Sequence, residues 1–204
     1  MTGQTLQFYK KNNKQLIQQY DSVNFETVHQ DWLAYLPPKG ELIVDVGAGS
    51  GRDVFWLVEH GYKVIAVDPV IEFYEQFKKK TQENFNGDEI RWLVDSLPDL
   101  SKLENYKNQV SMILLSAVWM HLSTQERINS FQTFSILNNQ HGLLVITLRH
   151  GTSPDERLMY PVSIAEIESL ATRYHYQVKT IKQSDDQLSR TEVFWETIVL
   201  EKIT

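Results

Sequence analysis

Short apolar segments rich in branched side chains alternate with longer amphipathic segments from about residue 41 onwards. The apolar segments are nearly continuous, a pattern typical of strands that are covered on both faces. We expect five such strands, at residues 41–46, 63–67, 90–94, 110–115 and 143–148. Two further segments of strand composition, 176–182 and 192–200, are separated by too few residues for a crossover helix, which predicts an antiparallel pair that closes the sheet.

Helices are predicted between these strands because the intervening segments carry recognisable helix ends. The first expected helix follows a glycine-rich stretch and ends at His60-Gly61, and the second starts at Asp68-Pro69 with proline at the first helical position. The third runs from a capping box at Ser123 to about Gly142, and the fourth starts at a second capping box at Ser163. Alternation of strands and helices predicts a doubly wound α/β domain.

Ahead of the sheet, apolar residues recur at helical spacing and end at Pro37-Pro38, where the helix must stop. They are Phe25, Val28, Trp32, Leu33 and Leu36. We therefore expect one domain over residues 1–204, in which residues 1–38 form an N-terminal helical extension. The sheet is expected to have seven strands, mostly parallel with an antiparallel terminal hairpin, and helices on both faces.

Composition and charge exclude or disfavour several classes of function. The chain has 20 basic and 26 acidic residues, and the net charge of −6 disfavours a broad nucleic-acid interface. Cysteine is absent, which excludes disulfides, thiolate metal sites and cysteine nucleophiles. The longest uncharged apolar run, 112–120, is too short to span a membrane, and the N-terminus lacks the apolar segment of a signal peptide. We expect a cytoplasmic protein with no membrane segment, no nucleic-acid partner and no metal; the oligomeric state stays open.

The stretch VDVGAGSGRD, residues 44–53, places three glycines at alternate positions directly after the first predicted strand. In a doubly wound sheet, ligands bind beyond the carboxyl ends of the strands, where the strand order reverses. The spacing GxGxG differs from the GxGxxG of dinucleotide sites, and Asp45 stands where a carboxylate would lie close to a pyrophosphate. A ligand with a cationic part suits this loop better, although a tight turn alone would also explain the glycines.

Two acidic positions follow the next strands in chain order. Asp68 ends the second strand, where a carboxylate can accept hydrogen bonds from both ribose hydroxyls, and it can equally cap the following helix. Asp95-Ser96 ends the third strand, where the exocyclic amine of adenine can be held, or where a loop residue can simply stand. Glycine loop and both acids together favour a ligand that contains adenosine.

With LLSAVWMHL at 114–122, these motifs resemble the class I S-adenosylmethionine-dependent methyltransferases over about residues 41–150. The resemblance implies a Rossmann-like fold, S-adenosylmethionine as cofactor and S-adenosylhomocysteine as product. For the methionine part, it implies that Asp45 holds the amino group and that Ser116 faces the reaction centre. It implies that the loop residues Gly47, Ala48 and Gly49 lie against the ligand. For the adenosine part, it implies that Asp68 and Pro69 lie at the ribose and that Asp95, Ser96 and Leu97 read the adenine.

Methyl transfer is an in-line displacement, so the protein must chiefly hold donor and acceptor in line, and it needs a base only when the acceptor must lose a proton. His121 is the candidate general base, with a packed or capping histidine as the alternative. Candidate acceptor contacts are Tyr20, Trp119, Arg149, His150 and Tyr160, together with Tyr9. Trp119 and Tyr160 can equally be packing residues, and Arg149 and His150 can be surface charges.

We expect a small-molecule acceptor, because the chain leaves little room for a separate substrate domain and residues 1–38 can act as a lid. SAVWMHL stands where enzymes that methylate exocyclic amines of DNA bases or glutamine amides carry an Asn/Asp-Pro-Pro-Tyr tetrad, so those roles lose support. The acceptor and its attacking atom stay open. An inactive S-adenosylmethionine-binding or regulatory protein of the same fold is the alternative, and the glycine spacing disfavours a nicotinamide oxidoreductase.

Overall fold

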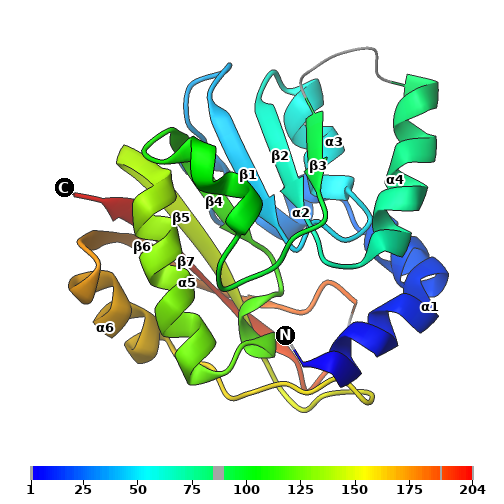
Figure 1. Ribbon diagram of the computed structural model, residues 1–204. Helices are drawn as coiled ribbons and strands as arrows, with labels where there is room; N and C mark the ends of the chain where they lie inside the picture. The colour runs from blue at the N-terminus through cyan, green and yellow to red at the C-terminus, as the bar shows by residue number, and fades with distance from the viewer. Residues whose placement is uncertain (1, 85–89, 189, 204) are drawn as a thin grey trace.

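The computed structural model of the chain describes residues 2–84, 90–188 and 190–203. A seven-stranded sheet forms the centre, in the order β3-β2-β1-β4-β5-β7-β6 (Figure 1). Its strands are β1 (Leu42–Val46), β2 (Lys63–Val67), β3 (Ile90–Leu93), β4 (Val110–Leu115), β5 (Asn138–His150), β6 (Tyr176–Asp185) and β7 (Phe194–Lys202). Strands β1 to β5 are parallel, and β7 runs antiparallel to both β5 and β6. The predicted mostly parallel sheet with an antiparallel terminal pair is confirmed.

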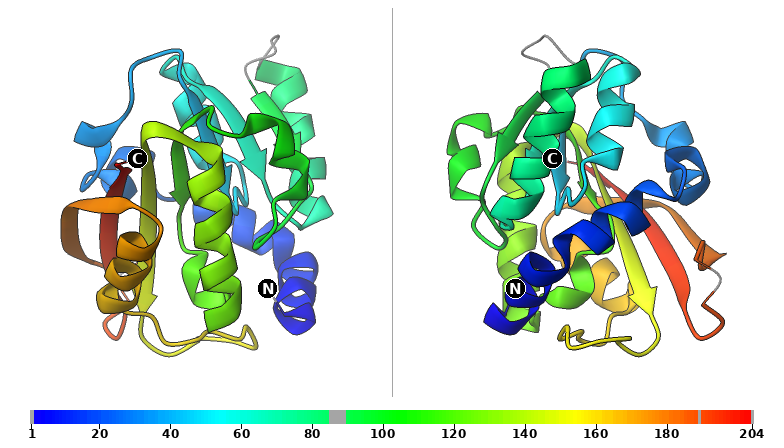
Figure 2. Two further views of the ribbon diagram at one scale, coloured as in Figure 1. Left: turned by 60° about the vertical axis from the view of Figure 1, so that its left-hand side comes forward. Right: turned by 90° about the vertical axis from the view of Figure 1, so that its right-hand side faces the viewer.

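Helices cover both faces of the sheet (Figure 2). They are α1 (Gly3–Asp21), α2 (Phe25–His29), α3 (Arg52–Glu59), α4 (Ile71–Asn84), α5 (Thr124–Leu137) and α6 (Ile164–Arg173), with short 3-10 turns at Leu33–Tyr35, Ser101–Tyr106 and Trp119–His121. Side chains of α5 and α6 pack on one face, and side chains of α2, α3 and α4 pack on the other. Because β4 lies between these layers, all six of its residues are buried, as its nearly continuous apolar sequence predicts.

The strand order reverses between β1 and β4, which pair in parallel with Asp45 opposite Leu114. The chain leaves β1 into the glycine loop and leaves β4 at Ser116. Both connections lie at the carboxyl edge of the sheet, so the loop and Ser116 flank the crevice in which doubly wound folds bind ligands.

The predicted single helix from Phe25 to Pro37 is wrong. The structure instead has the short helix α2, which ends at His29, and a 3-10 turn that begins at Leu33. The chain turns between them because the indole of Trp32 donates a hydrogen bond to Nδ1 of His29 (3.1 Å). Phe25 and Trp32 are still buried together against α3, so the apolar pattern identified the buried residues but not their element.

Helix α1 precedes this turn and packs against α4 at the edge of the molecule (Figure 1). Tyr9 and Leu16 of α1 contact the buried Val70 and Phe73. The sequence predicts an N-terminal helical extension without the bounds of this helix. None of the helices in the described part of the chain has the length and apolarity that crossing a membrane requires.

Helix α4 begins at Ile71 and not at Pro69, so the predicted helix start is wrong. The side chain of Asp68 explains the shift, because its Oδ1 accepts a hydrogen bond from the N–H of Val70 (2.8 Å). This bond forms a turn that delays the first helical residue. Asp68 thereby orients its carboxylate towards the glycine loop before the helix begins.

Helix α5 ends at Leu137 and not near Gly142, so this predicted boundary is also wrong. Asn138 anchors the following residues in β5, because its amide donates to the carbonyl of Val110 (3.0 Å) and its Oδ1 accepts from the hydroxyl of Tyr176 (2.8 Å). A buried asparagine with these partners stabilises the strand where local sequence favoured more helix.

Other helix ends agree with the sequence. Helix α3 ends before His60, and Gly61 takes the expected left-handed conformation with φ of +90°. The capping box of α5 is formed between Ser123 and Glu126. Ser163 caps α6, but Glu166 pairs with an arginine of α5 and does not complete a second box.

Candidate functional site

The glycine loop, residues 47–51, joins β1 to α3 at the carboxyl edge of the sheet. All three of its glycines have φ between +54° and +81°, a conformation that other residues adopt at a cost in energy. A Cβ at Gly47 would also collide with Cγ2 of Val118. The N–H groups of Gly47 and Ala48 both donate to the carbonyl of Val67 (2.7 and 3.1 Å), which fixes the loop across the end of β2.

Asp68 follows β2 directly, and its carboxylate is bound to the glycine loop. Its Oδ2 accepts from the N–H of Gly49 (3.0 Å), while Oδ1 accepts from Val70 (2.8 Å). The residue is only 5% exposed, and burial raises the pKa of Asp68 to about 6 while the two N–H donors oppose the rise. Each oxygen retains a second lone pair, so the carboxylate can accept further hydrogen bonds from a ligand.

Two more carboxylates lie behind the loop. Asp45, at the end of β1, is buried, and its Oδ2 has no hydrogen-bond partner among the described residues. Burial, with the charge of Asp53, raises the pKa of Asp45 well above its usual value. Asp53 accepts from Nε2 of His29 (2.8 Å) and Nε of Arg52 (2.6 Å); burial alone would raise its pKa, but these two partners lower it. Asp53 therefore fastens α2 to α3 as a carboxylate.

A cavity of about 230 Å³ lies at the carboxyl edge of the sheet. The structure brings these predicted residues to its wall: Tyr20, Gly47, Ala48, Gly49, Asp68, Ser116, His121 and Arg149. The rest of the wall includes residues of α1, of the segment 151–162 and of the connection between β6 and β7. Within the described ranges, no group of three or more acidic or histidine side chains is placed to hold a metal ion.

The residues predicted to read adenine lie outside this wall. The carboxylate of Asp95 accepts from the N–H groups of Ser96 and Lys102 (both 2.8 Å) and closes its own loop. Leu97 is buried in the core. Asp45 and Pro69 do not line the cavity either, so the structure assembles the loop and ribose positions but not the adenine positions at one wall.

Three of the candidate acceptor contacts also lie away from the cavity. Trp119 is fully buried in the core on the α5 side of the sheet. Nε2 of His150 lies 2.7 Å from Oε2 of Glu196. Tyr160 is half-buried. Because successive residues of a strand face opposite sides, Arg149 lines the cavity while His150 does not.

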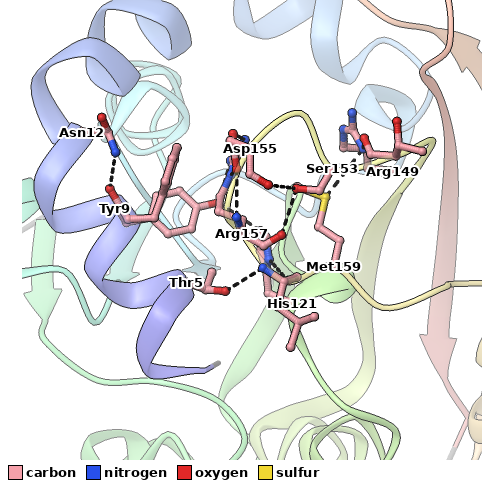
Figure 3. Close-up of polar contacts among 12 residues, drawn as sticks. Thr5, Tyr9, Asn12, His121, Arg149, Ser153, Asp155, Arg157 and Met159 are labelled. Atoms are coloured by element: carbon pink, nitrogen blue, oxygen red, sulfur yellow. Dashed lines mark hydrogen bonds and ion pairs between the residues drawn. The ribbon is translucent and has the colours of Figure 1, made fainter.

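A hydrogen-bonded cluster connects α1 with the segment 151–162 at the cavity wall (Figure 3). Nδ1 of His121 lies 3.1 Å from the carbonyl of Leu158, and Nε2 lies 3.0 Å from the hydroxyl of Tyr9. A carbonyl only accepts, so Nδ1 carries the proton and Nε2 accepts from Tyr9. The same hydroxyl accepts from Nη1 of Arg157 (3.1 Å). Burial lowers the pKa of His121 to about 4, so the ring is neutral near pH 7.

Further contacts fasten the same two segments (Figure 3). Thr5 of α1 accepts a hydrogen bond from the N–H of Leu158 (3.1 Å), and the amide of Gln4 donates to the carbonyl of Glu156 (3.1 Å). Asp155 binds the guanidinium of Arg157 through both carboxylate oxygens (2.8 and 2.7 Å). Helix α1 and the segment 151–162 therefore form one side of the cavity together.

Sequence reasoning missed several residues of this site. Thr147 lines the cavity, and its hydroxyl accepts from the N–H of Ala117 (2.8 Å). Strand alternation supplied a signal for it, because Thr147 and Arg149 share one face of β5. Arg157 gave no such signal, since it lies in a segment without regular structure and meets its partner Tyr9 across most of the chain.

Comparison with known proteins shows which proteins this chain is similar to. Residues 43–142 match the family model of the methyltransferase domain. A thiopurine S-methyltransferase of Legionella pneumophila subsp. pneumophila is 28% identical over 85 residues, which cover 37% of this chain and 38% of that relative. The matched segment therefore spans well under half of the curated relative.

Solved structures share the fold at low sequence identity. Burkholderia thailandensis 1,6-didemethyltoxoflavin-N1-methyltransferase superposes with a TM-score of 0.76 at 17% identity, covering 96% of this chain and 84% of that one. The geranyl diphosphate C-methyltransferase of Streptomyces coelicolor A3(2) gives a TM-score of 0.70 at 13% identity, covering 87% and 77%. Residues 43–142 therefore match a methyltransferase domain, and the chain shares the fold of these solved methyltransferases.

Proposed function

We propose that this chain transfers a methyl group from S-adenosylmethionine to a small-molecule acceptor. The observation that carries the proposal is the buried carboxylate of Asp68, which is bound to the N–H of Gly49 and lines a cavity where the strand order reverses. In doubly wound folds, an acid at this position accepts hydrogen bonds from ribose hydroxyls. Two of the similar proteins are named for methylating thiopurines and 1,6-didemethyltoxoflavin, and this supports a small acceptor.

The residues present fit this cofactor. Gly47 and Gly49 keep bare backbone at the cavity, and Asp68 offers two unused lone pairs to the ribose. Asp45 has a buried oxygen without a donor behind the loop but outside the cavity wall, so its role at the methionine ammonium group stays a prediction. Ser116, at the end of β4, would lie beside the methionine part. The roles of Ala48 and Pro69, and of residues 95–97 at the adenine, stay predictions.

Catalysis then depends on how the chain holds the acceptor. When bound, S-adenosylmethionine supplies an electrophilic methyl carbon: the lone pair of the acceptor forms the new bond as the carbon–sulfur bond breaks, and its electron pair returns to sulfur. The chain keeps the acceptor in line and excludes water. Helix α1 and the segment 151–162 supply this enclosure, which supports the lid role of residues 1–38.

His121 is better suited to positioning Tyr9 than to removing a proton from the acceptor. Both of its ring nitrogens are engaged, one with Leu158 and one with Tyr9. A direct base role would require the bond to Tyr9 to break first. An acceptor that loses its proton to water after transfer needs no such base.

The proposal leaves other roles as predictions. The cytoplasmic location and the absence of a nucleic-acid partner rest on composition and charge alone. Among the candidate acceptor contacts, Tyr9, Tyr20 and Arg149 line the cavity. Contacts from Trp119, His150 or Tyr160 would require them to reach the acceptor from outside the present wall.

Turnover on a panel of small acceptors tests the proposal. The full chain is incubated with S-adenosylmethionine and a mixture of aromatic thiols, amines and phenols, and methylated products are identified by mass spectrometry. We expect at least one methylated product, together with S-adenosylhomocysteine, and a loss of both in Asp68→Ala. Asp99→Asn, a change at an exposed acid, is the matched control and should be active. Cofactor binding without any product across the panel would favour the inactive alternative.

A further inference from the structure

The cavity wall holds four arginines, and one of them lacks a carboxylate partner. The three ion pairs are Arg52–Asp53, Arg157–Asp155 and Arg190–Asp186, with N–O distances of 2.6, 2.7 and 2.6 Å. Within the residues that the structure describes, Arg149 has no ion pair. The wall therefore carries one positive charge that its own acids do not neutralise locally.

Arg149 is 7% exposed, and only one end of its guanidinium is satisfied. Nη1 donates to the carbonyls of Gly151 and Thr152 (both 3.0 Å) and lies 3.6 Å from Sδ of Met159. Figure 3 shows Arg149 beside Met159 at the end of this cluster. Nε and Nη2 have no partner in the described part of the chain. These two nitrogens form the edge of a guanidinium that binds a carboxylate through two parallel hydrogen bonds.

The acids whose charges act on Arg149 already pair with other arginines. Both oxygens of Asp186 accept from Arg190, and one also accepts from the indole of Trp195 (2.9 Å). Asp155 is held by Arg157. Asp185 also lines the cavity, but it is exposed, so water screens its charge. Burial lowers the pKa of Arg149, the charges of Arg190 and Arg157 lower it further, and the charges of Asp186 and Asp155 oppose this shift in part.

A buried cation without a counter-ion is costly, so such a group usually has a partner at a functional site. Arg149 keeps its charge despite the lowered pKa, because arginine does not deprotonate in proteins. Its position at the wall of a cavity means that a ligand can supply the missing anion.

The position of Arg149 along β5 fits the acceptor and not the cofactor. Thr147 lies two residues earlier on the same face, and its hydroxyl accepts from the N–H of Ala117, next to Ser116 at the reaction centre. Two strand residues span about 7 Å. Arg149 is therefore about the length of one substituted ring further along the cavity, beyond the place where methyl transfer is proposed.

We propose that the acceptor carries a carboxylate, which the Nε–Nη2 edge of Arg149 binds while the acceptor's nucleophilic atom lies near Ser116. This inference rests on the proposed function and adds its substrate class. Met159 and Trp195 supply apolar wall on the way to Arg149, so the body of the acceptor is expected to be a small apolar or aromatic ring.

The test compares carboxylates with their neutral amides, which have nearly the same shape. The full chain is saturated with S-adenosylhomocysteine and titrated calorimetrically with benzoate and benzamide, nicotinate and nicotinamide, and para-hydroxybenzoate and para-hydroxybenzamide. We expect at least one carboxylate to bind about tenfold or more tightly than its amide, as a desolvated bidentate pair would give. Arg149→Gln should abolish this preference, and Arg149→Lys should retain part of it.

Arg173→Gln is the matched control, because Arg173 lies in the last turn of α6 and does not line the cavity. It should keep the carboxylate preference unchanged. Equal affinity for every acid and amide, no binding of any carboxylate at millimolar concentration, or an unchanged preference in Arg149→Gln would overturn the inference. Binding of S-adenosylhomocysteine is measured first in every variant. If the native chain does not bind it, the proposed function is contradicted. If the native chain binds it but shows no carboxylate preference, only the acceptor class is contradicted.

Discussion

Lowering the pH from about 7 to about 5 is expected to weaken the binding of methylthioadenosine roughly tenfold through Asp68. Burial raises the pKa of Asp68 to about 6. The side chain is then about 90% ionised at the higher pH and about 10% ionised at the lower one. Ribose hydroxyls donate to the carboxylate, so at low pH the proton must first leave, at a cost of about 1.4 kcal/mol.

Methylthioadenosine is the suitable ligand because it contains the adenosine and the thioether but lacks the amino and carboxyl groups that titrate in the full cofactor. Its dissociation constant is measured calorimetrically across this pH range, with circular dichroism at each pH to show that the chain stays folded. Asp68→Asn is the control, and it should bind weakly with little dependence on pH, because an amide does not ionise.

Equal affinity of the native chain at both pH values would refute the placement of the ribose at Asp68. A pH dependence that persists in Asp68→Asn would also refute it, since another group would then be responsible. The sign is specific: affinity must fall as the pH falls, because the bound ligand requires the ionised acid.

Three further results are expected. Gly47→Ala should lower stability by roughly 1–3 kcal/mol in urea unfolding and weaken S-adenosylhomocysteine binding, because the new Cβ collides with Val118 at a φ of +81°; an unchanged midpoint would contradict this. His121 has a folded-state pKa of about 4, below its usual 6.5, so it contributes stability above about pH 6.5 that is lost as the pH falls towards 4. Between pH 7 and pH 5 the native chain should therefore lose about 2 kcal/mol more than His121→Gln in urea unfolding, and equal losses would refute the assignment. Deletion of residues 1–30 should abolish turnover in the mass-spectrometric assay, and undiminished turnover would remove the lid role.

Features encoded within short stretches of sequence were predictable. Five of the six buried residues of β4 are apolar, and the three loop glycines share a conformation that only glycine takes readily. Asp68 was identified because the end of a strand and the start of its helix are adjacent in sequence. These positions follow from local rules, so the sheet and the loop side of the site could be derived.

Features that depend on distant partners were not predictable. The cluster of Tyr9, His121 and Arg157 joins segments more than 100 residues apart, and none of the three stands in a periodic pattern that signals the contact. The end of α5 was misplaced for the same reason, because Asn138 is held by Val110 and Tyr176 from other strands. Tertiary hydrogen bonds overrode local helix preference there.

Calorimetric titration of the full chain with S-adenosylhomocysteine tests the central claim most directly. The claim is that the glycine loop and Asp68 form an adenosine-binding site, so one site per chain should bind the ligand, and Asp68→Ala should weaken binding by about tenfold or more. No binding at high micromolar ligand, or the same affinity in native chain and variant, would contradict the account.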